Sequence, residues 1–312
     1  MATRTFDKKN IILLKIDEHD LNSFLVDMDI DDDGNPHFML EELANSIINV
    51  IPEYVFAHYE DPMIPQNDTV DKLREAAKSI YKIKEFDLMR RHYLDKDESV
   101  VDKIKKLKSP NRGEFGELLL HLLLRDFKGT VPLISKVYFK DSSGVPAHGF
   151  DSVHISPNEN ILWLGESKFY VNSKTGINKL IEDLSNHIQK DYLNEQFNII
   201  KKSLNYNTIP MRDEWIRVLN ECSKLSEKIK IINIPLLCIY PHDIYKIYSD
   251  MKDSKTFVYH ESNIRELKKH FVDNNHHRLK NQLNIILMLF PVENKKQLAT
   301  ILHEKLWHMQ SM

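Results

Sequence analysis

The sequence is poor in cysteine and glycine. Its two cysteines, Cys222 and Cys238, among 312 residues exclude a disulfide framework and a four-cysteine zinc site. Eight glycines are too few for collagen, for flexible linkers or for glycine-rich phosphate-binding loops. No apolar run approaches the roughly 18 residues of a membrane-spanning helix, and the first residues form no signal-peptide apolar segment. We therefore expect a cytoplasmic protein with no membrane partner.

A large excess of one charge is also absent. The 43 basic and 46 acidic residues give a net charge of −3, which does not draw the whole chain to polyanions. The charge is uneven, however, because residues 1–62 hold 14 acidic and four basic residues, a net −10, which leaves +7 for the rest. Such a split suggests two segments with different partners, or one segment that masks the other. A solvated acidic face is an equally simple interpretation.

The order of elements predicts an α/β (α+β) fold. Apolar periodicity indicates a core of α-β-β-β-α-β order, a mixed sheet flanked by helices. The segments are a helix over 112–127, strands over 132–139, 148–155 and 161–170, a helix over 174–203 capped by Ser173, and a strand over 231–240. An α+β part precedes this core, with strands over 10–16 and 24–30, an Asp33-Gly34 turn and a helix over 40–56. Ser109-Pro110 is the best boundary, which predicts an acidic region 1–108 and a core domain 109–312.

The most informative segment is the predicted hairpin over 148–168. If the chain reverses in a two-residue turn at Asn158-Glu159, opposed residues have numbers that sum to 317, so Asp151 lies opposite Glu166. Alternation along the strand puts Lys168 on the same face as Glu166. Asp151, Glu166 and Lys168 therefore lie at the end of the apolar face of the hairpin.

Opposed acids destabilise a strand pair unless something cationic compensates them. Lys168 compensates in part, and a divalent cation bound by Asp151 and Glu166 does so better. The preceding helix adds a third carboxylate, because Glu117 shares its stripe with Leu120, His121 and Leu124. Glu114 is the alternative, nearer the helix start where an exposed acid is favourable. An ordinary ion cluster at a sheet edge is the non-functional alternative to the whole arrangement.

This combination resembles the PD-(D/E)XK nuclease superfamily, with Phe150 where that motif often has proline. Three stretches resemble the HamA family more narrowly, the nuclease subunit of the bacterial Hachiman antiphage system. They are Arg112-Gly-Glu-Phe-Gly-Glu117, Gly149-Phe-Asp-Ser-Val-His154 and Trp163-Leu-Gly-Glu-Ser-Lys-Phe169. The motif match covers about residues 110–170.

The resemblance implies a restriction-endonuclease-like fold and a Mg²⁺-dependent (or Mn²⁺-dependent) DNase. It also implies a partner, the superfamily 2 helicase HamB, and a role in disabling infected cells by degrading DNA. Asp151, Glu166 and Glu117 would then bind the metal, while Lys168 orients the attacking water and stabilises charge on the phosphate. Two alternatives are a catalytically inert adaptor that keeps the fold to bind a helicase, and an RNase or tRNA-cleaving toxin, because a fold does not fix the substrate.

Basic and polar side chains near these motifs are candidates for DNA contact. A basic run leads into the predicted catalytic helix, with Lys105, Lys106, Lys108 and Arg112 as candidate phosphate contacts. Lys174 and Gln189 belong to the next helix, where a solvated face is the simpler interpretation. The acidic region 1–108 is the candidate for docking the partner or for restraining DNA binding.

Overall fold

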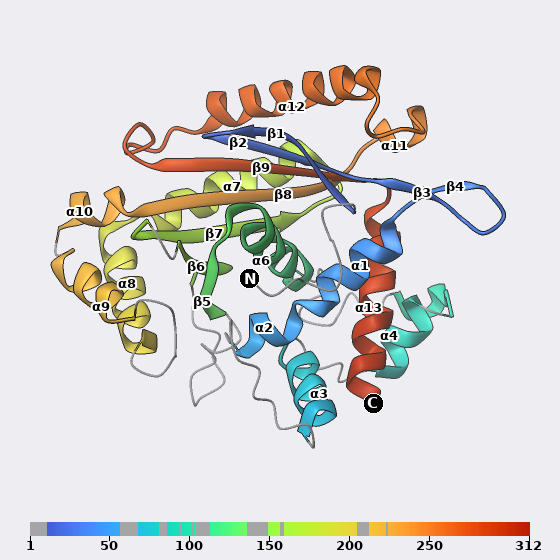
Figure 1. The fold of residues 1–312 in the computed structure, drawn as a ribbon, viewed down its shortest axis with the longest axis horizontal. Coiled ribbons are helices and arrows are strands. Elements are labelled where there is room, and N and C mark those ends of the chain that lie inside the picture. Colours follow the sequence, from blue (N-terminus) through green and yellow to red (C-terminus); the bar gives the residue numbers. More distant parts are fainter. Residues whose placement is uncertain are drawn as a thin grey trace.

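The core of the fold is a seven-stranded mixed sheet (Figure 1). The computed structural model describes residues 11–56, 68–80, 86–93, 95–101, 103, 113–135, 149–156, 159–204, 212–222 and 224–312. The strand order is β1-β2-β9-β8-β7-β6-β5. The bounds are β1 Ile12–Glu18, β2 Leu21–Val26, β9 Asn284–Val292, β8 Ile232–Pro241, β7 Ile161–Phe169, β6 Ser152–Ser156 and β5 Val131–Ser135. Strands β2, β9, β8 and β7 run parallel, and the pairs β1–β2, β7–β6 and β6–β5 are antiparallel.

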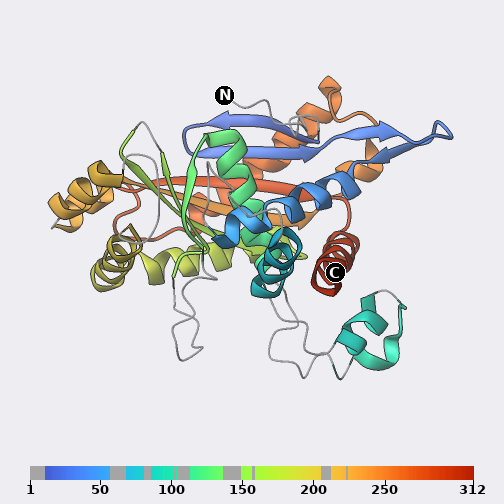
Figure 2. The same ribbon diagram turned by 60° about the horizontal axis from the view of Figure 1, so that its bottom comes forward.

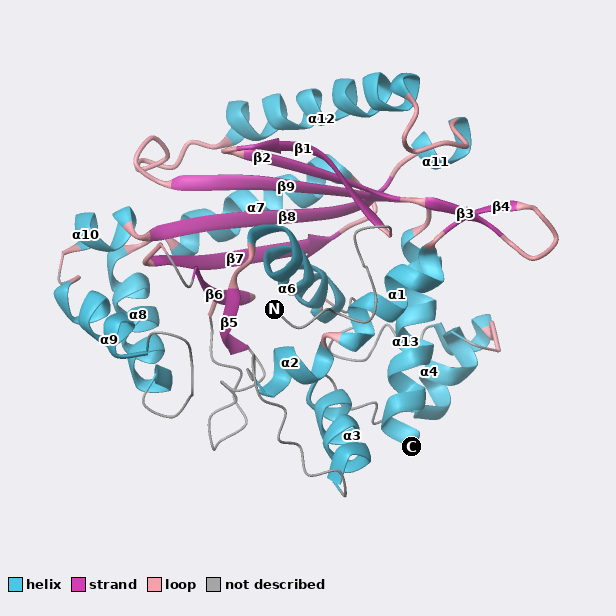
Figure 3. Cartoon of the chain, in the orientation of Figure 1, coloured by secondary structure: helices cyan, strands magenta, loops and turns pink. Residues whose placement is uncertain are grey.

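Helices cover both faces of this sheet, as Figure 3 shows by the helices in front of and behind the strands. The helices on one face are α1 Leu40–Asn49, α2 Ile51–Phe56, α6 Glu114–Lys128 and α13 Lys295–Ser311, and α3 Thr69–Ile80 packs on α2 and α13. The other packs on α7 Ser173–His187, α8 Lys190–Leu204, α9 Arg212–Glu221 and α12 Ser254–Asn274. Alternation along β7 follows this division, because Trp163 joins the first core and Leu162 and Leu164 join the second. Strand β8 is buried along nearly its whole length, as expected for a central parallel strand.

The α/β class and the helix-flanked mixed sheet are confirmed, and several predicted boundaries are wrong. The helix predicted over 174–203 is two helices, α7 and α8, separated at Ile188 and Gln189. Its cap is Asn172 rather than Ser173, because the Asn172 side chain accepts a hydrogen bond from the Thr175 N–H at 2.9 Å. The helix predicted over 40–56 is likewise divided into α1 and α2 around Val50, next to Pro52.

The N-terminal part joins the same sheet as the predicted core domain. Strand β2 pairs with the C-terminal strand β9, so the sheet continues across the predicted boundary at 108/109. The strand predicted over 24–30 is divided between β2 and β3 Met28–Ile30, which forms a separate hairpin with β4 Pro36–Phe38. That hairpin projects from the sheet (Figure 2), and Gly34 takes a φ of 82° in its turn, as the Asp33-Gly34 prediction requires.

The remaining elements are short. They are α4 Phe86–Tyr93, η3 Glu98–Val100, α10 Leu225–Lys230 and α11 Ile244–Ile247. None of the helices in the described ranges is both long and apolar enough to cross a membrane.

Candidate active site

The β6–β7 hairpin has the predicted register. Ser152 pairs with Gly165 and Ser156 with Ile161, so the paired numbers sum to 317 along the whole ladder. Asp151 directly precedes β6 and lies beside Glu166 of β7, and both side chains are buried, at 6% and 2% exposure. Burial and the neighbouring charge of Asp151 raise the pKa of Glu166 to about 7. The hairpin therefore brings Asp151 and Glu166 together, and their proximity and burial disfavour the ionised form of Glu166.

The Asp151 carboxylate is held by the next strand. Oδ2 of Asp151 accepts hydrogen bonds from the backbone N–H of Ser167 at 3.0 Å and from its hydroxyl at 3.1 Å. Ser167 faces α6, since a Cβ added at Gly116 of that helix would stand 3.1 Å from the Ser167 Oγ. Close approach of α6 to β7 therefore depends on a glycine.

Glu166 is directed toward α7. Its Oε1 lies 2.6 Å from Nδ1 of His187, the last residue of that helix. Burial lowers the pKa of His187, but the hydrogen bond with Glu166 and its charge outweigh burial and leave this pKa above its ordinary value. The His187 ring also stacks on Tyr192, with ring centroids 4.6 Å apart. His187 could not be predicted from the sequence, because the end of α7 carries no glycine or proline signal.

Lys168 forms an ion pair with Asp183 of α7. Burial by itself lowers the pKa of Lys168, but the carboxylates of Asp151 and Asp183 outweigh burial and the pKa lies above its ordinary value. The ammonium group therefore keeps its proton at neutral pH beside the acids of the hairpin.

Glu117 reaches the site from the opposite face of the sheet, on α6. The Tyr54 hydroxyl, on α2, donates to its Oε2 at 2.8 Å and to the Asp151 backbone carbonyl at 3.3 Å. Burial and the Glu117 charge raise the pKa of Tyr54 well above its ordinary value, so the phenol stays a neutral donor. Tyr54 could not be predicted from the sequence as part of the site, because nothing in its own segment distinguishes it from a core tyrosine.

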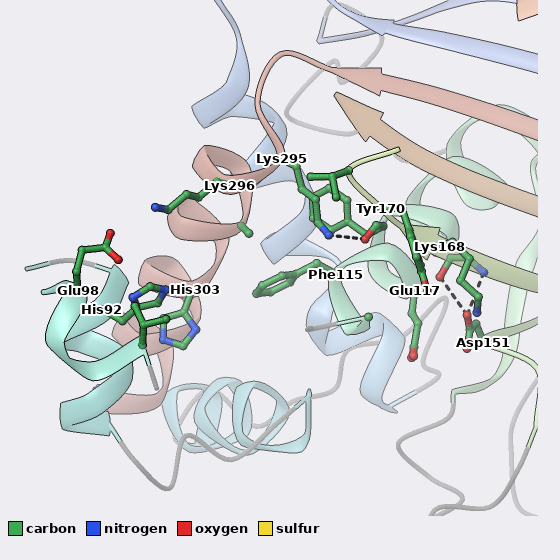
Figure 4. A pocket seen from close by; sticks show the side chains of 16 residues that line it. His92, Glu98, Phe115, Glu117, Asp151, Lys168, Tyr170, Lys295, Lys296 and His303 are labelled. Carbon is green, nitrogen blue, oxygen red and sulfur yellow. Dashed lines mark hydrogen bonds between the residues drawn. The ribbon is translucent and has the colours of Figure 1, made fainter. Parts of the chain in front are cut away.

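A cavity of about 730 Å³ opens at this point (Figure 4). Glu117, Asp151, Ser167 and Lys168 line one end of it. Phe115, Phe169, Tyr170 and Val171 also line it, and residues of α4, η3 and α13 line the other end, among them His92, Glu98, Lys295, Lys296 and His303. Glu166 is not among the described residues that line it, in keeping with its contact to His187.

Comparison with known families decides the relationship that the motifs suggest. The HamA family model matches residues 4–306. The chain belongs to the HamA family. This membership makes it a component of the Hachiman antiphage defence system. A search of the curated proteins gives no match.

The carboxylates of the candidate site in this HamA-family chain supply some, but not all, of the ligands that a hard divalent cation needs. Among the described residues, no three carboxylate, imidazole or thiolate groups form a ready-made metal site. Glu117 and Asp151 nevertheless line one cavity, and two carboxylates completed by water and phosphate oxygens are a usual Mg²⁺ environment. The buried acid pair Asp151 and Glu166 also leaves negative charge that a cation would relieve. The chemistry therefore fits a two-carboxylate site and does not fit a preformed cage of three.

Of the residues predicted to contact DNA, only Lys174 and Gln189 belong to the part of the chain that the structure describes. Lys105, Lys106, Lys108 and Arg112 lie outside the described residues. Lys174 is exposed and pairs with Glu266 at 2.6 Å, and Gln189 is exposed and donates to the Ser185 carbonyl at 3.3 Å. Neither is among the described residues that line the cavity. Glu114, the alternative to Glu117, is not among them either.

Proposed function

We propose that this HamA-family chain is a metal-dependent DNase that hydrolyses phosphodiester bonds and works with a superfamily 2 helicase partner in Hachiman defence. The observation that carries the proposal is the meeting of Glu117, Asp151 and Lys168 at one end of one cavity. Two buried carboxylates and a protonated lysine are what hydrolysis of a phosphodiester requires: ligands for a cation and a fixed positive charge for the phosphate.

Asp151 and Glu117 would hold Mg²⁺ or Mn²⁺, with Glu166 beside Asp151 as a further carboxylate. When bound, such a cation supplies Lewis-acid polarisation of the scissile phosphate. Ser167 fixes the Asp151 carboxylate through two hydrogen bonds, and Tyr54 fixes that of Glu117 through one. These donors orient the carboxylates before substrate arrives.

Lys168 orients the attacking water and stabilises the negative charge that develops on the phosphate oxygens. Its ion pair with Asp183 restricts the side chain, and the neighbouring acids keep it protonated. Water attacks the phosphorus in line and gives up one proton to solvent, the P–O bond opposite the incoming oxygen breaks, and the leaving oxygen takes up a proton from solvent.

The test is incubation of the pure chain with plasmid DNA and, separately, with RNA, in Mg²⁺ or in EDTA, with and without the helicase partner. EDTA-sensitive loss of DNA supports the proposal. Preferential loss of RNA would favour an RNase or tRNA-cleaving toxin instead. No loss of either nucleic acid under any of these conditions would favour an inert adaptor.

A further inference from the structure

The end of the cavity away from the carboxylates carries two lysines of α13. Lys295 and Lys296 occupy the first turn of that helix and both line the cavity. Figure 4 shows Lys295 between Lys296 and the end where Glu117 and Asp151 lie. A strand of nucleic acid bound along the cavity as far as the carboxylates would therefore lie beside these two ammonium groups.

Lys295 is anchored to the catalytic strand itself. Its Nζ donates to the Phe169 carbonyl at 2.6 Å and lies 4.9 Å from the centroid of the Phe169 ring. Phe169 directly follows Lys168, so the charge of Lys295 is fixed beside the last residues of β7. An ammonium group has three donors, and a carbonyl uses one of them.

No carboxylate in the described residues forms an ion pair with either lysine. Glu98 lines the same cavity, but it has no ion pair with them within 4.0 Å in the described residues. The other described lysine that lines the cavity differs, since Lys168 pairs with Asp183, and Lys305, farther along α13, pairs with Glu41. Burial without a carboxylate also lowers the pKa of Lys295, which an anionic ligand would reverse.

We propose that Lys295 and Lys296 form a phosphate-binding subsite for the backbone of the polynucleotide whose scissile phosphate lies at Glu117 and Asp151. This inference rests on the proposed function, because the ligand is the same polynucleotide. Contacts of this kind fix the register of the strand and carry no base specificity. They also make the affinity depend on salt, because each neutralised phosphate releases counterions.

The test is the binding of a fluorescein-labelled DNA oligonucleotide to the full-length chain in EDTA, followed by fluorescence anisotropy over a range of salt concentrations. K295Q/K296Q should weaken binding about tenfold at low salt and reduce the slope of log affinity against log salt by about 2. K295R/K296R keeps both charges and should retain most of the affinity.

The matched control is K246Q/K269Q, which removes two exposed lysines that form ion pairs within their own segments. It should change DNA affinity less than twofold, because salt screens the interaction of exposed charges with a ligand bound far from them. Equal affinity of K295Q/K296Q and this control, both correctly folded by circular dichroism, would overturn the subsite. So would an absence of DNA binding by the wild type.

The two proposals fail separately. Lysine-dependent DNA binding without Mg²⁺-dependent cleavage by the wild type would contradict the nuclease and support the subsite. Mg²⁺-dependent cleavage by the wild type, together with DNA binding that K295Q/K296Q does not weaken, would contradict the subsite and leave the proposed nuclease activity unaffected.

Discussion

The hydroxyl of Tyr54 donates a hydrogen bond to Oε2 of Glu117 at 2.8 Å, and both groups are buried. Tyr54 belongs to α2 in the acidic N-terminal part, whereas Glu117 belongs to α6 next to the hairpin. The contact therefore makes the N-terminal part a structural component of the candidate site. Removal of residues 1–62 would take away this donor together with strands β1 and β2. Such a deletion therefore cannot test by itself whether the acidic N-terminal part restrains DNA binding.

Tyr54→Phe should lower the affinity for Mn²⁺ and the free energy of unfolding together. The change removes the donor that orients the Glu117 carboxylate and with it a buried hydrogen bond to a charged group, at a cost of about 1–3 kcal/mol. Metal affinity is measured by Mn²⁺ electron paramagnetic resonance and stability by urea unfolding.

Tyr245→Phe is the matched control, because Tyr245 is also buried, accepts from the Val26 N–H and donates to the Pro291 carbonyl, away from the cavity. It should lose stability by a similar amount and keep its Mn²⁺ affinity. Equal Mn²⁺ affinity in Tyr54→Phe and the wild type would contradict the positioning role.

Glu166→Gln should stabilise the fold at pH 8 and change little at pH 4. The pKa of Glu166 is about 7 in the folded chain against 4.5 ordinarily, so folding favours its protonated form. The associated stability is fully present below pH 4.5 and is lost as the pH rises through 7, by up to roughly 3 kcal/mol at 1.36 kcal/mol per pKa unit. Glutamine keeps a neutral side chain at every pH and escapes this loss.

Urea unfolding of wild type and Glu166→Gln at both pH values measures the effect. Glu221→Gln, at an exposed residue of α9 that pairs with Arg217, is the control and should follow the wild type. A difference between Glu166→Gln and wild type that is the same at pH 4 and pH 8 would refute the burial argument.

Gly165→Ala should destabilise the contact between α6 and β7. An added Cβ would stand 2.8 Å from Cδ2 of Leu120 and 3.1 Å from Cγ of Pro235, where no side chain fits without movement. Overpacking of this kind typically costs 1–3 kcal/mol, and we expect about 2 kcal/mol by thermal or urea unfolding. Adding Leu120→Val, which shortens the clashing side chain, should recover part of the loss. No loss in the single variant would show that α6 and β7 can separate freely.

The sequence predicted the parts of the site that depend on local geometry. A two-residue turn fixes the partner of every residue in a hairpin, so Asp151 and Glu166 could be placed side by side without any tertiary information. Helical periodicity likewise placed Glu117 on a buried face.

The contacts it missed join segments far apart in the chain. Tyr54, His187 and Lys295 reach the site from α2, the end of α7 and the start of α13. Their positions follow from the packing of helices on both faces of the sheet and from the division of one long helix into α7 and α8. No turn, cap or period in their own segments carries that information.

The central claim is that Glu117 and Asp151, with Glu166 beside Asp151 as a further carboxylate, and Lys168 serve hydrolysis of DNA. The most direct test is nicking of supercoiled plasmid by wild type, Glu166→Gln and Lys168→Ala in Mg²⁺ and in EDTA, with Glu221→Gln and Lys246→Ala as controls. We expect Mg²⁺-dependent nicking by the wild type and both controls, and a loss of about 100-fold or more in the two site variants with unchanged circular dichroism. Undiminished Mg²⁺-dependent nicking by either Glu166→Gln or Lys168→Ala would contradict it.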